Sequence, residues 1–206
     1  MKRSFPTGIH AHQHRPVLVI ASGNPLKVAE ISAMLAVVDL HVRQQPEGLE
    51  IEETGTTYLA NARLKAEAVA SLTGEWTLAD DSGVEVDALG GRPGIYSARY
   101  AGSDQEKIQR LLGELGDCPY RGARFISAMA LADPAGHTVL EAEGICYGTI
   151  LMGPQGGGHG YDSIFHVREA SSTYAEMSPH MRNRVGSRGK AARAMAPGLR
   201  QLLGIC

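Results

Sequence analysis

A short apolar run at residues 16–21 (PVLVIA) leads directly into a small polar turn and then into a helical pattern. Such a run, rich in β-branched residues, predicts a buried strand, and the apolar spacing over 26–35 predicts the helix. Extended segments near 40–43 and 76–79 follow, with a predicted helix over about 57–72 between them. This alternation of strands and helices predicts a mixed α/β fold.

The second half of the chain predicts further elements of both kinds. Residues 105–115 predict an amphipathic helix. Two strand patterns, at 124–132 and 137–147, flank the turn sequence Asp-Pro-Ala-Gly, which predicts an antiparallel hairpin. The segment 187–203 is helical in composition, and we expect Pro197 to interrupt it.

Composition excludes several classes of function. The 206 residues carry a formal net charge of -2, so the chain lacks the basic field that stable nucleic-acid binding requires. Three scattered cysteines favour a reducing compartment over a disulfide framework. No apolar stretch resembles a signal peptide or a membrane span. We therefore expect a cytoplasmic protein without membrane association.

The predicted domain organisation is simple. We expect residues 1–15 to form a flexible N-terminal tail and residues 16–206 to form a single domain. His10, His12 and His14 alternate in the tail, where a poorly ordered terminus is the simpler interpretation and metal binding is the alternative.

The turn after the first predicted strand, SGNPLK (Ser22–Lys27), has features of an anion site. A helix that starts there presents unpaired backbone N–H groups and the positive end of its dipole. Lys27 adds a positive charge. The segment lacks the second glycine and the Ser or Thr of the GxxxxGK[ST] phosphate loop, so an ordinary strand-to-helix turn is the alternative.

Adjacent carboxylates follow the predicted strand at 76–79, in the sequence DDSG at 80–83. Neighbouring carboxylates repel each other without a cation, and Mg²⁺ needs only one or two carboxylates beside substrate phosphates. A carboxylate next to a metal-held water also serves as a general base. The alternative is a turn between strands, and we expect the strand to end at this cluster before a second extended piece at 84–86.

An acidic segment and a helix add further candidates. Glu52 and Glu53 precede the predicted helix, on which Asn61 and Lys65 are four residues apart and so share one face. The alternative interpretation is ordinary solvated surface.

A glycine-rich loop at 153–162 places polar and ring side chains close together in sequence. Flat rings stack on a base, and an aspartate accepts hydrogen bonds from its N–H groups. Arginine downstream suits a ring carbonyl such as O6 of a 6-oxopurine. Ordinary surface residues are again the alternative for each of the candidates His159, Tyr161, Asp162, Arg182, Ser187, Arg188 and Lys190.

Several segments, taken in their order along the chain, resemble those of the inosine triphosphatase family. The matching blocks are ASGNPLK, EETGTTYLANARLKA, ADDSGVEVDALGGRPGIYSARYAG, GYDSIF, TYAEM and SRGKA, from about residue 17 to 195. The resemblance implies an α/β fold, an elongated mixed β-sheet with flanking helices in two lobes around a central cleft, usually in a homodimer. It also implies Mg²⁺-dependent hydrolysis of ITP, dITP or XTP to the monophosphate and pyrophosphate, which removes non-standard purines from the nucleotide pool.

The resemblance also implies roles for individual residues. Glu53 and Asp81 bind Mg²⁺, and Asp81 activates the attacking water. Lys65 lies along the phosphate path, and Ser82 contacts the nucleotide. The implied phosphate-binding residues are Ser22, Gly23, Asn24, Pro25, Leu26 and Lys27, and those that enclose the base are His159, Gly160, Tyr161, Asp162, Arg182, Ser187 and Arg188.

Three departures from the family pattern fall in the base pocket. His159 stands where the family usually has Phe, Ser187 where it has His, and Arg182 where Lys is common. A weaker stacking ring and a shorter donor act on base binding, whereas Glu53, Asp81 and the phosphate turn are unaltered. We therefore expect hydrolysis to survive while base discrimination weakens or shifts.

Two other hypotheses stay open. One is a catalytically weakened or silent nucleotide-binding homologue, or one with shifted specificity, and the intact Glu53 and Asp81 count against silence. The other is a phosphatase with an aspartyl nucleophile, which needs two carboxylates on one side of the chain. Adjacent Asp80 and Asp81 would point to opposite sides of an extended segment. The sequence leaves open the base preference, the number of metal ions, the phosphorus attacked and the dimer contacts.

Overall fold

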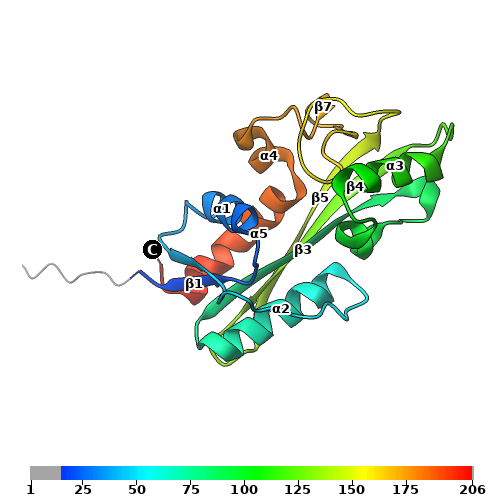
Figure 1. Cartoon of the computed structure of the whole chain (residues 1–206). Coiled ribbons are helices and arrows are strands. Elements are labelled where there is room, and N and C mark those ends of the chain that lie inside the picture. Colours follow the sequence, from blue (N-terminus) through cyan, green and yellow to red (C-terminus); the bar gives the residue numbers. More distant parts are fainter. Residues whose placement is uncertain (1–14, 206) are drawn as a thin grey trace, which may run out of the picture.

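The computed structural model describes residues 15–205, so residues 1–14, with most of the predicted tail and its three histidines, lie outside the described part. A seven-stranded mixed sheet runs through the molecule in the order β2-β1-β3-β4-β5-β6-β7, with helices on both faces (Figure 1). The strands are β1 (Val17–Ile20), β2 (His41–Gln44), β3 (Trp76–Val86), β4 (Gly122–Ala132), β5 (Thr138–Ile150), β6 (Phe165–Val167) and β7 (Ser172–Thr173). The helices are α1 (Pro25–Met34), α2 (Tyr58–Thr73), α3 (Asp104–Leu115), α4 (Pro179–Val185) and α5 (Ser187–Leu202), with short 3₁₀ helices η1 (Asp87–Leu89) and η2 (Gly94–Arg99).

Strand β3 has neighbours on both sides over only part of its length. The parallel strand β1 pairs with it at residues 76–78, whereas the antiparallel strand β4 pairs with it over 77–86. Beyond Leu78, the β1 side of β3 has no strand partner within residues 15–205 apart from a bridge between Glu85 and Pro93. The carboxyl end of β1 therefore opens onto a free edge of β3. Crevices at such carboxyl ends are where open α/β sheets bind ligands.

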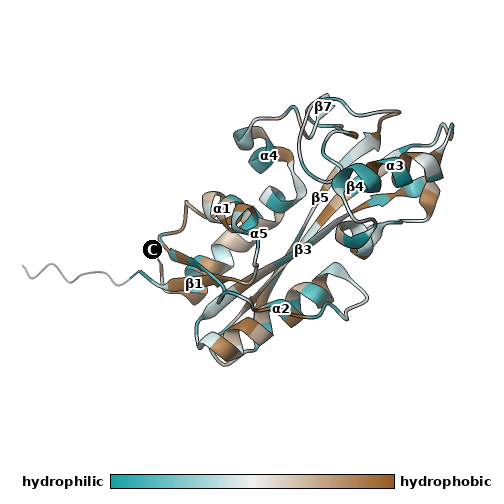
Figure 2. Ribbon diagram, in the orientation of Figure 1, coloured by the Kyte–Doolittle hydropathy of each residue, from teal (hydrophilic) through white to brown (hydrophobic). Residues whose placement is uncertain are grey.

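Two helical layers bury the faces of the sheet. Small residues of α2, Ala62 and Ala66, are fully buried against β1, β3 and β4. On the opposite face, Ile31 of α1 and Met195 of α5 pack against apolar side chains of the same strands. Because α2 presents small side chains, its backbone approaches the sheet closely and its polar residues reach the free edge of β3. Figure 2 shows apolar residues, in brown, along β1 and in parts of α1 and α2.

The half of the sheet that lies farther from β1 and β2, which we call the second lobe, has a separate core. Leu111 of α3 and Phe165 of β6 are fully buried there, with Val84 of β3. The long strands β3, β4 and β5 pass through both halves (Figure 1). The molecule is therefore an elongated two-lobed α/β structure, which confirms the predicted fold class. None of the helices described for residues 15–205 has the length and apolar character needed to cross a bilayer.

Three details differ from the sequence-based expectations. Strand β3 continues through residues 80–83, where we expected a turn, because β4 pairs with every residue of this segment. Pro197 lies inside α5 and does not end it, since Met195 and Leu199 on either side are fully buried. Helix α4 was not predicted, although Ser178 followed by a proline is a helix-start signal. The hairpin of β4 and β5 is confirmed.

Candidate active site

A cavity lies at the free edge of β3 and continues toward α4. One part has a volume of about 410 Å³ and the other of about 1040 Å³, and the two parts share several lining residues. The smaller part joins the β1–α1 turn, the carboxylates beside β3 and the loop before β6, although these segments are far apart in the sequence. Its lining includes Asn24, Lys27, Glu53, Asp81, Ser82, Gly160, Asp162 and Arg188.

The β1–α1 turn is held by its own side chains. Oδ1 of Asn24 accepts hydrogen bonds from the N–H groups of Leu26 at 2.9 Å and Lys27 at 3.4 Å. Oγ of Ser22 accepts one from the N–H of Asn24 at 3.2 Å. These N–H groups, which we expected to be unpaired, are therefore engaged, because asparagine is a strong N-cap. The positive charge at the turn comes from Lys27, which lines both parts of the cavity.

Asp80 is a buried anion between two cations. Its Oδ2 lies 2.8 Å from Nζ of Lys27 and 3.3 Å from Nη2 of Arg188. Arg188 also pairs with Glu30 of α1 and donates to Oγ of Ser82 at 3.1 Å. Burial alone would raise the pKa of Asp80, but the charges of Arg188 and Lys27 hold that pKa well below the ordinary carboxyl value. This network joins α1, β3 and α5.

Asp81 faces the other side of β3, toward α2. Asn61 donates from Nδ2 to Asp81 Oδ2 at 3.1 Å, and Lys65 Nζ lies 3.5 Å from Asp81 Oδ1. The same ammonium group contacts Glu53 Oε1 at 2.7 Å and also donates to the backbone carbonyl of Asp80 at 3.0 Å. Asn61 and Lys65 thus share one helix face, as predicted, and Lys65 joins the two carboxylates. The opposite orientations of Asp80 and Asp81 are also as predicted.

The two cavity carboxylates differ in pKa. Burial raises the pKa of Asp81 above the ordinary value, and the charge of Glu53 raises it further, although Lys65 acts against them. Burial also acts on Glu53, but hydrogen bonds from Lys65 and Arg99 bring its pKa below the ordinary value. The Arg99 bond, from Nη1 to Glu53 Oε2, is 3.0 Å long. The raised pKa makes Asp81 the better proton acceptor of the pair.

Glu53 and Asp81 fit a magnesium ion. Among residues 15–205, no group of three or more His, Cys, Asp or Glu side chains is arranged to hold a metal. Mg²⁺ is usually bound by one or two carboxylates together with substrate phosphates and waters, so a pair is sufficient. The oxygens of this pair already accept from Lys65, Asn61 and Arg99, but each keeps a second lone pair.

The loop before β6 is anchored from two directions. The N–H of Gly160 donates to Oδ2 of Asp104, at the start of α3, at 2.7 Å. The hydroxyl of Tyr161 donates to the carbonyl of Ser97 at 3.1 Å. These contacts fix the backbone that carries His159 and Asp162, which line both parts of the cavity.

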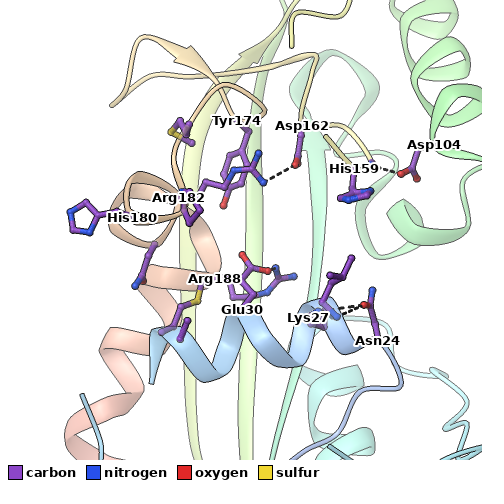
Figure 3. Close-up of a pocket in the computed structure, with 17 residues that line it drawn as sticks. Asn24, Lys27, Glu30, Asp104, His159, Asp162, Tyr174, His180, Arg182 and Arg188 are labelled. Carbon is purple, nitrogen blue, oxygen red and sulfur yellow. Dashed lines mark hydrogen bonds and ion pairs between the residues drawn. The ribbon is translucent and has the colours of Figure 1, made fainter. Parts of the chain in front are cut away.

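Asp162 and Arg182 point toward each other across the larger part of the cavity (Figure 3). Arg182 Nη1 lies 3.3 Å from Asp162 Oδ2, and its guanidinium lies over the ring of Tyr174 with 5.3 Å to the centroid. Burial raises the pKa of Asp162, which the charge of Arg182 partly offsets. This end of the cavity therefore offers a carboxylate acceptor, a guanidinium donor and an aromatic ring.

Ser187, at the start of α5, faces a second hydroxyl group. Its Oγ lies 2.9 Å from Oγ of Ser127 on β4, and both residues are buried. The neighbouring Gly186 lies directly against the hydroxyl of Tyr174, where a Cβ would collide. Position 187, where the resemblance implied a histidine, thus carries one of two paired, buried hydroxyl groups.

Most of the predicted site residues meet in this cavity. Lys65 lies behind Glu53 and Asp81 and does not form part of the lining. Ser22, Gly23 and Pro25 also lie outside the lining. Leu26 and Arg182 line only the larger part, whereas the smaller part is lined by Asn24, Lys27, Glu53, Asp81, Ser82, His159, Gly160, Tyr161, Asp162, Ser187 and Arg188.

Sequence reasoning assigned no role to three further lining residues, Asp104, Lys107 and Tyr174. Ser103 and Glu106 form a capping box that marks the start of α3. That signal could have placed Asp104 at a helix end. No pattern in the sequence predicts that α3 lies at the cavity, because its position depends on how the second lobe folds over β3.

Fold and cavity together define an α/β protein whose cleft combines a cationic turn, two carboxylates and a recess with an aromatic ring and an arginine. Comparison with known proteins narrows this class. The chain belongs to the Ham1 family, whose model matches residues 18–198. The match confirms the family resemblance inferred from the sequence.

Relatives of known sequence and structure cover most of the chain. It is 51% identical over 188 residues to a dITP/XTP pyrophosphatase of Synechococcus sp., covering 91% of each chain. It is 50% identical over 188 residues to a dITP/XTP pyrophosphatase of Nostoc sp., covering 91% of this chain and 96% of the relative. A HAM1 protein from Coxiella burnetii superposes with a TM-score of 0.83 at 37% identity, covering 90% of this chain and 99% of that chain. The Staphylococcus aureus Ham1 protein gives 0.81 with the same identity and coverage.

Proposed function

We propose that this protein is a Mg²⁺-dependent pyrophosphatase that hydrolyses ITP, dITP and XTP to the monophosphate and pyrophosphate. Membership of the Ham1 family and the names of the relatives support this reaction. The observation that carries the proposal is the one cavity shared by Lys27, the pair Glu53–Asp81 and the loop at 159–162. A nucleotide along this cavity would place its phosphate tail at Lys27 and its base at the loop.

Asp81 is the proposed general base. Asn61 and Lys65 fix its carboxylate, and the raised pKa favours proton acceptance. The oxygen of a water would attack the α-phosphorus, the bond from that phosphorus to the oxygen bridging to the β-phosphate would break, and pyrophosphate would leave with the electron pair of that bond. The proton of the water would pass to the carboxylate of Asp81. General base catalysis of this kind contributes roughly 10²- to 10⁴-fold in rate.

Cations along the cavity would balance the charge of the substrate. Mg²⁺ bound by Glu53 and Asp81 would neutralise phosphate charge and polarise the attacking water. Lys27 would bind the terminal phosphates, and its ion pair with Asp80 holds its side chain at the cavity wall. Lys65 keeps Glu53 and Asp81 close together despite their like charges.

The base would lie between the loop and α4. Asp162 would accept hydrogen bonds from ring N–H groups, and Arg182 would donate to a ring carbonyl such as O6. His159 offers a smaller stacking surface than Phe, and Ser187 a shorter donor than His. We therefore include in the proposal a base preference that is weaker than in the family pattern, or shifted from it.

We further propose that the protein acts as a cytoplasmic homodimer on free nucleotides, without stable nucleic-acid binding. The net charge of -2 supports the last point. The exposed ring of Tyr96, within the glycine- and proline-rich segment 90–100, supports a subunit contact there. Sedimentation of the wild type is expected to give a dimer, and Tyr96→Glu a shift toward monomer. A monomeric wild type would exclude the dimer.

Product analysis tests the proposed reaction. We expect ITP with Mg²⁺ to give pyrophosphate, and EDTA to stop its release. Orthophosphate should appear only after an inorganic pyrophosphatase is added. Nucleotide binding without any turnover would support the alternative of a silent binding homologue. Direct release of orthophosphate would indicate a phosphatase instead.

A further inference from the structure

A lysine of the second lobe lines the same cavity part as the carboxylates. Lys107 is on α3, and its side chain is only 15% exposed. It shares the lining with Asp81 of β3 and Lys27 of α1. Its ammonium group pairs with Oδ1 of Asp104, one turn earlier on the same helix, at 3.0 Å. The roles proposed above for the other cations leave this ammonium group unexplained.

The cations of the cavity differ in how firmly they are held. Lys27 pairs with Asp80, whose side chain is 0% exposed, so moving Lys27 away would leave a buried charge uncompensated. Arg188 shares the same partner. Asp104, by contrast, is 44% exposed, and ion pairs with exposed groups contribute little to stability. The ammonium of Lys107 is therefore easier to redirect to a ligand than either of the other two.

Asp104 also keeps a second partner if Lys107 turns away. Its Oδ2 accepts the N–H of Gly160, and this hydrogen bond is the main cause of the lowered pKa of Asp104. The contact ties the start of α3 to the loop at the proposed base end. Lys107 and Gly160 therefore contact the two oxygens of the same carboxylate, which places the ammonium group of Lys107 beside this loop.

We propose that Lys107 is a further substrate-binding residue, which contacts the phosphate nearest the sugar of the bound nucleotide. This inference rests on the proposed function, because it uses the same nucleotide orientation. A lysine ammonium binds phosphate as a compact point charge. Lys107 would neutralise charge from the α3 wall, whereas Lys27 acts at the other end of the phosphate chain.

IMP and inosine differ by one phosphate group, so comparing them separates the contact of Lys107 with this phosphate from contacts with the base and the sugar. For Lys107→Ala we expect KM for ITP to rise about tenfold with kcat nearly unchanged, since a hydrogen bond to a charged group is lost from ground and transition state alike. Calorimetry should show IMP binding weakened by a similar factor and inosine binding unchanged. Lys107→Arg keeps the charge and should retain most of the affinity.

Arg110→Gln is the matched control. It removes one positive charge from the same helix, one turn further on, at a residue outside the cavity lining. We expect its KM for ITP to equal that of the wild type. An equal rise in both variants would show a general charge effect and overturn the inference, as would unchanged IMP binding or weakened inosine binding in Lys107→Ala. A wild type that releases no pyrophosphate would refute the proposed function instead, and IMP binding would still test Lys107.

Discussion

The two faces of β3 give neighbouring aspartates opposite properties. On the α1–α5 face, Asp80 is surrounded by Lys27 and Arg188, and its pKa is lowered despite burial. On the α2 face, burial and the charge of Glu53 raise the pKa of Asp81. One carboxylate is thus a fixed anion of the framework, and the other is a group suited to accept a proton. The comparison shows that partners from distant segments, and not the residue type, decide the role.

The largest expected effect comes from the α2 face. Asp81→Asn keeps the shape of the side chain, but its amide cannot accept a proton and can accept only one of the two hydrogen bonds that the carboxylate accepts from Asn61 and Lys65. We expect kcat for ITP to fall by roughly 10²- to 10⁴-fold or more, while nucleotide binding persists. Steady-state kinetics and calorimetry with ITP check both parts. Near-normal turnover would remove Asp81 from the role of general base.

Asp80→Asn tests the other face. The substitution leaves Lys27 and Arg188 without their buried counter-charge, so we expect the free energy of unfolding to fall by about 3 kcal/mol. Because Asp80 does not face the carboxylate pair, kcat should fall much less than in Asp81→Asn. Urea unfolding and kinetics on the same preparation measure the two effects. A folded variant with turnover as low as that of Asp81→Asn would contradict the proposed division between the faces.

The pH dependence of stability should also separate the two carboxylates. The lowered pKa of Asp80 stabilises the fold above the ordinary value of 3.8, and this contribution is lost as pH falls below it. The raised pKa of Asp81 has the opposite effect on stability, which declines as pH rises from 3.8 through that pKa. Each slope is at most about 1.4 kcal/mol per pH unit.

Unfolding curves between acid and neutral pH, recorded in EDTA, test these signs. Asp80→Asn should flatten the loss of stability at the acid end. Asp81→Asn should remove the decline above 3.8. Identical pH profiles for the two variants would mean that the two carboxylates do not differ in this way.

The smallest expected effect lies at the base end. Ser187→Ala removes one of two buried hydroxyls and leaves Ser127 without its partner, a loss of about 1 kcal/mol. We expect only a several-fold change in the ratio of kcat/KM between ITP and GTP. Strong rejection of GTP and ATP by the wild type would contradict the expected weak discrimination.

Much of the fold was predictable because it depends on local patterns. The run at 16–21 and the hairpin turn chemistry marked β1, β4 and β5 correctly. The turn predicted at 80–83 was wrong. Asp, Ser and Gly favour turns locally, but pairing with β4 and the charged partners of the aspartates hold this segment extended. The predicted interruption of the helix at Pro197 was wrong for a similar reason, because burial of the neighbouring residues maintains α5.

The sequence picked out many of the residues that line the candidate cavity, but few of the contacts between them. Spacing alone placed Asn61 and Lys65 on one face and separated Asp80 from Asp81. The ion pairs of Asp80 join residues 53 and 108 positions away, and no local pattern encodes such distances. Lys107 was missed for the same reason, because its helix belongs to the other lobe.

The free edge of β3 has a consequence for solubility. Bare strand edges invite pairing with the edge of another molecule. Here the carbonyl of Asp80 on that edge accepts hydrogen bonds from Lys65 at 3.0 Å and Lys27 at 3.4 Å. Their bulky charged side chains therefore screen the strand against intermolecular β-pairing. A chain that lost both lysines would be prone to aggregate, so selection for a soluble protein and selection for the cationic cavity act on the same two positions.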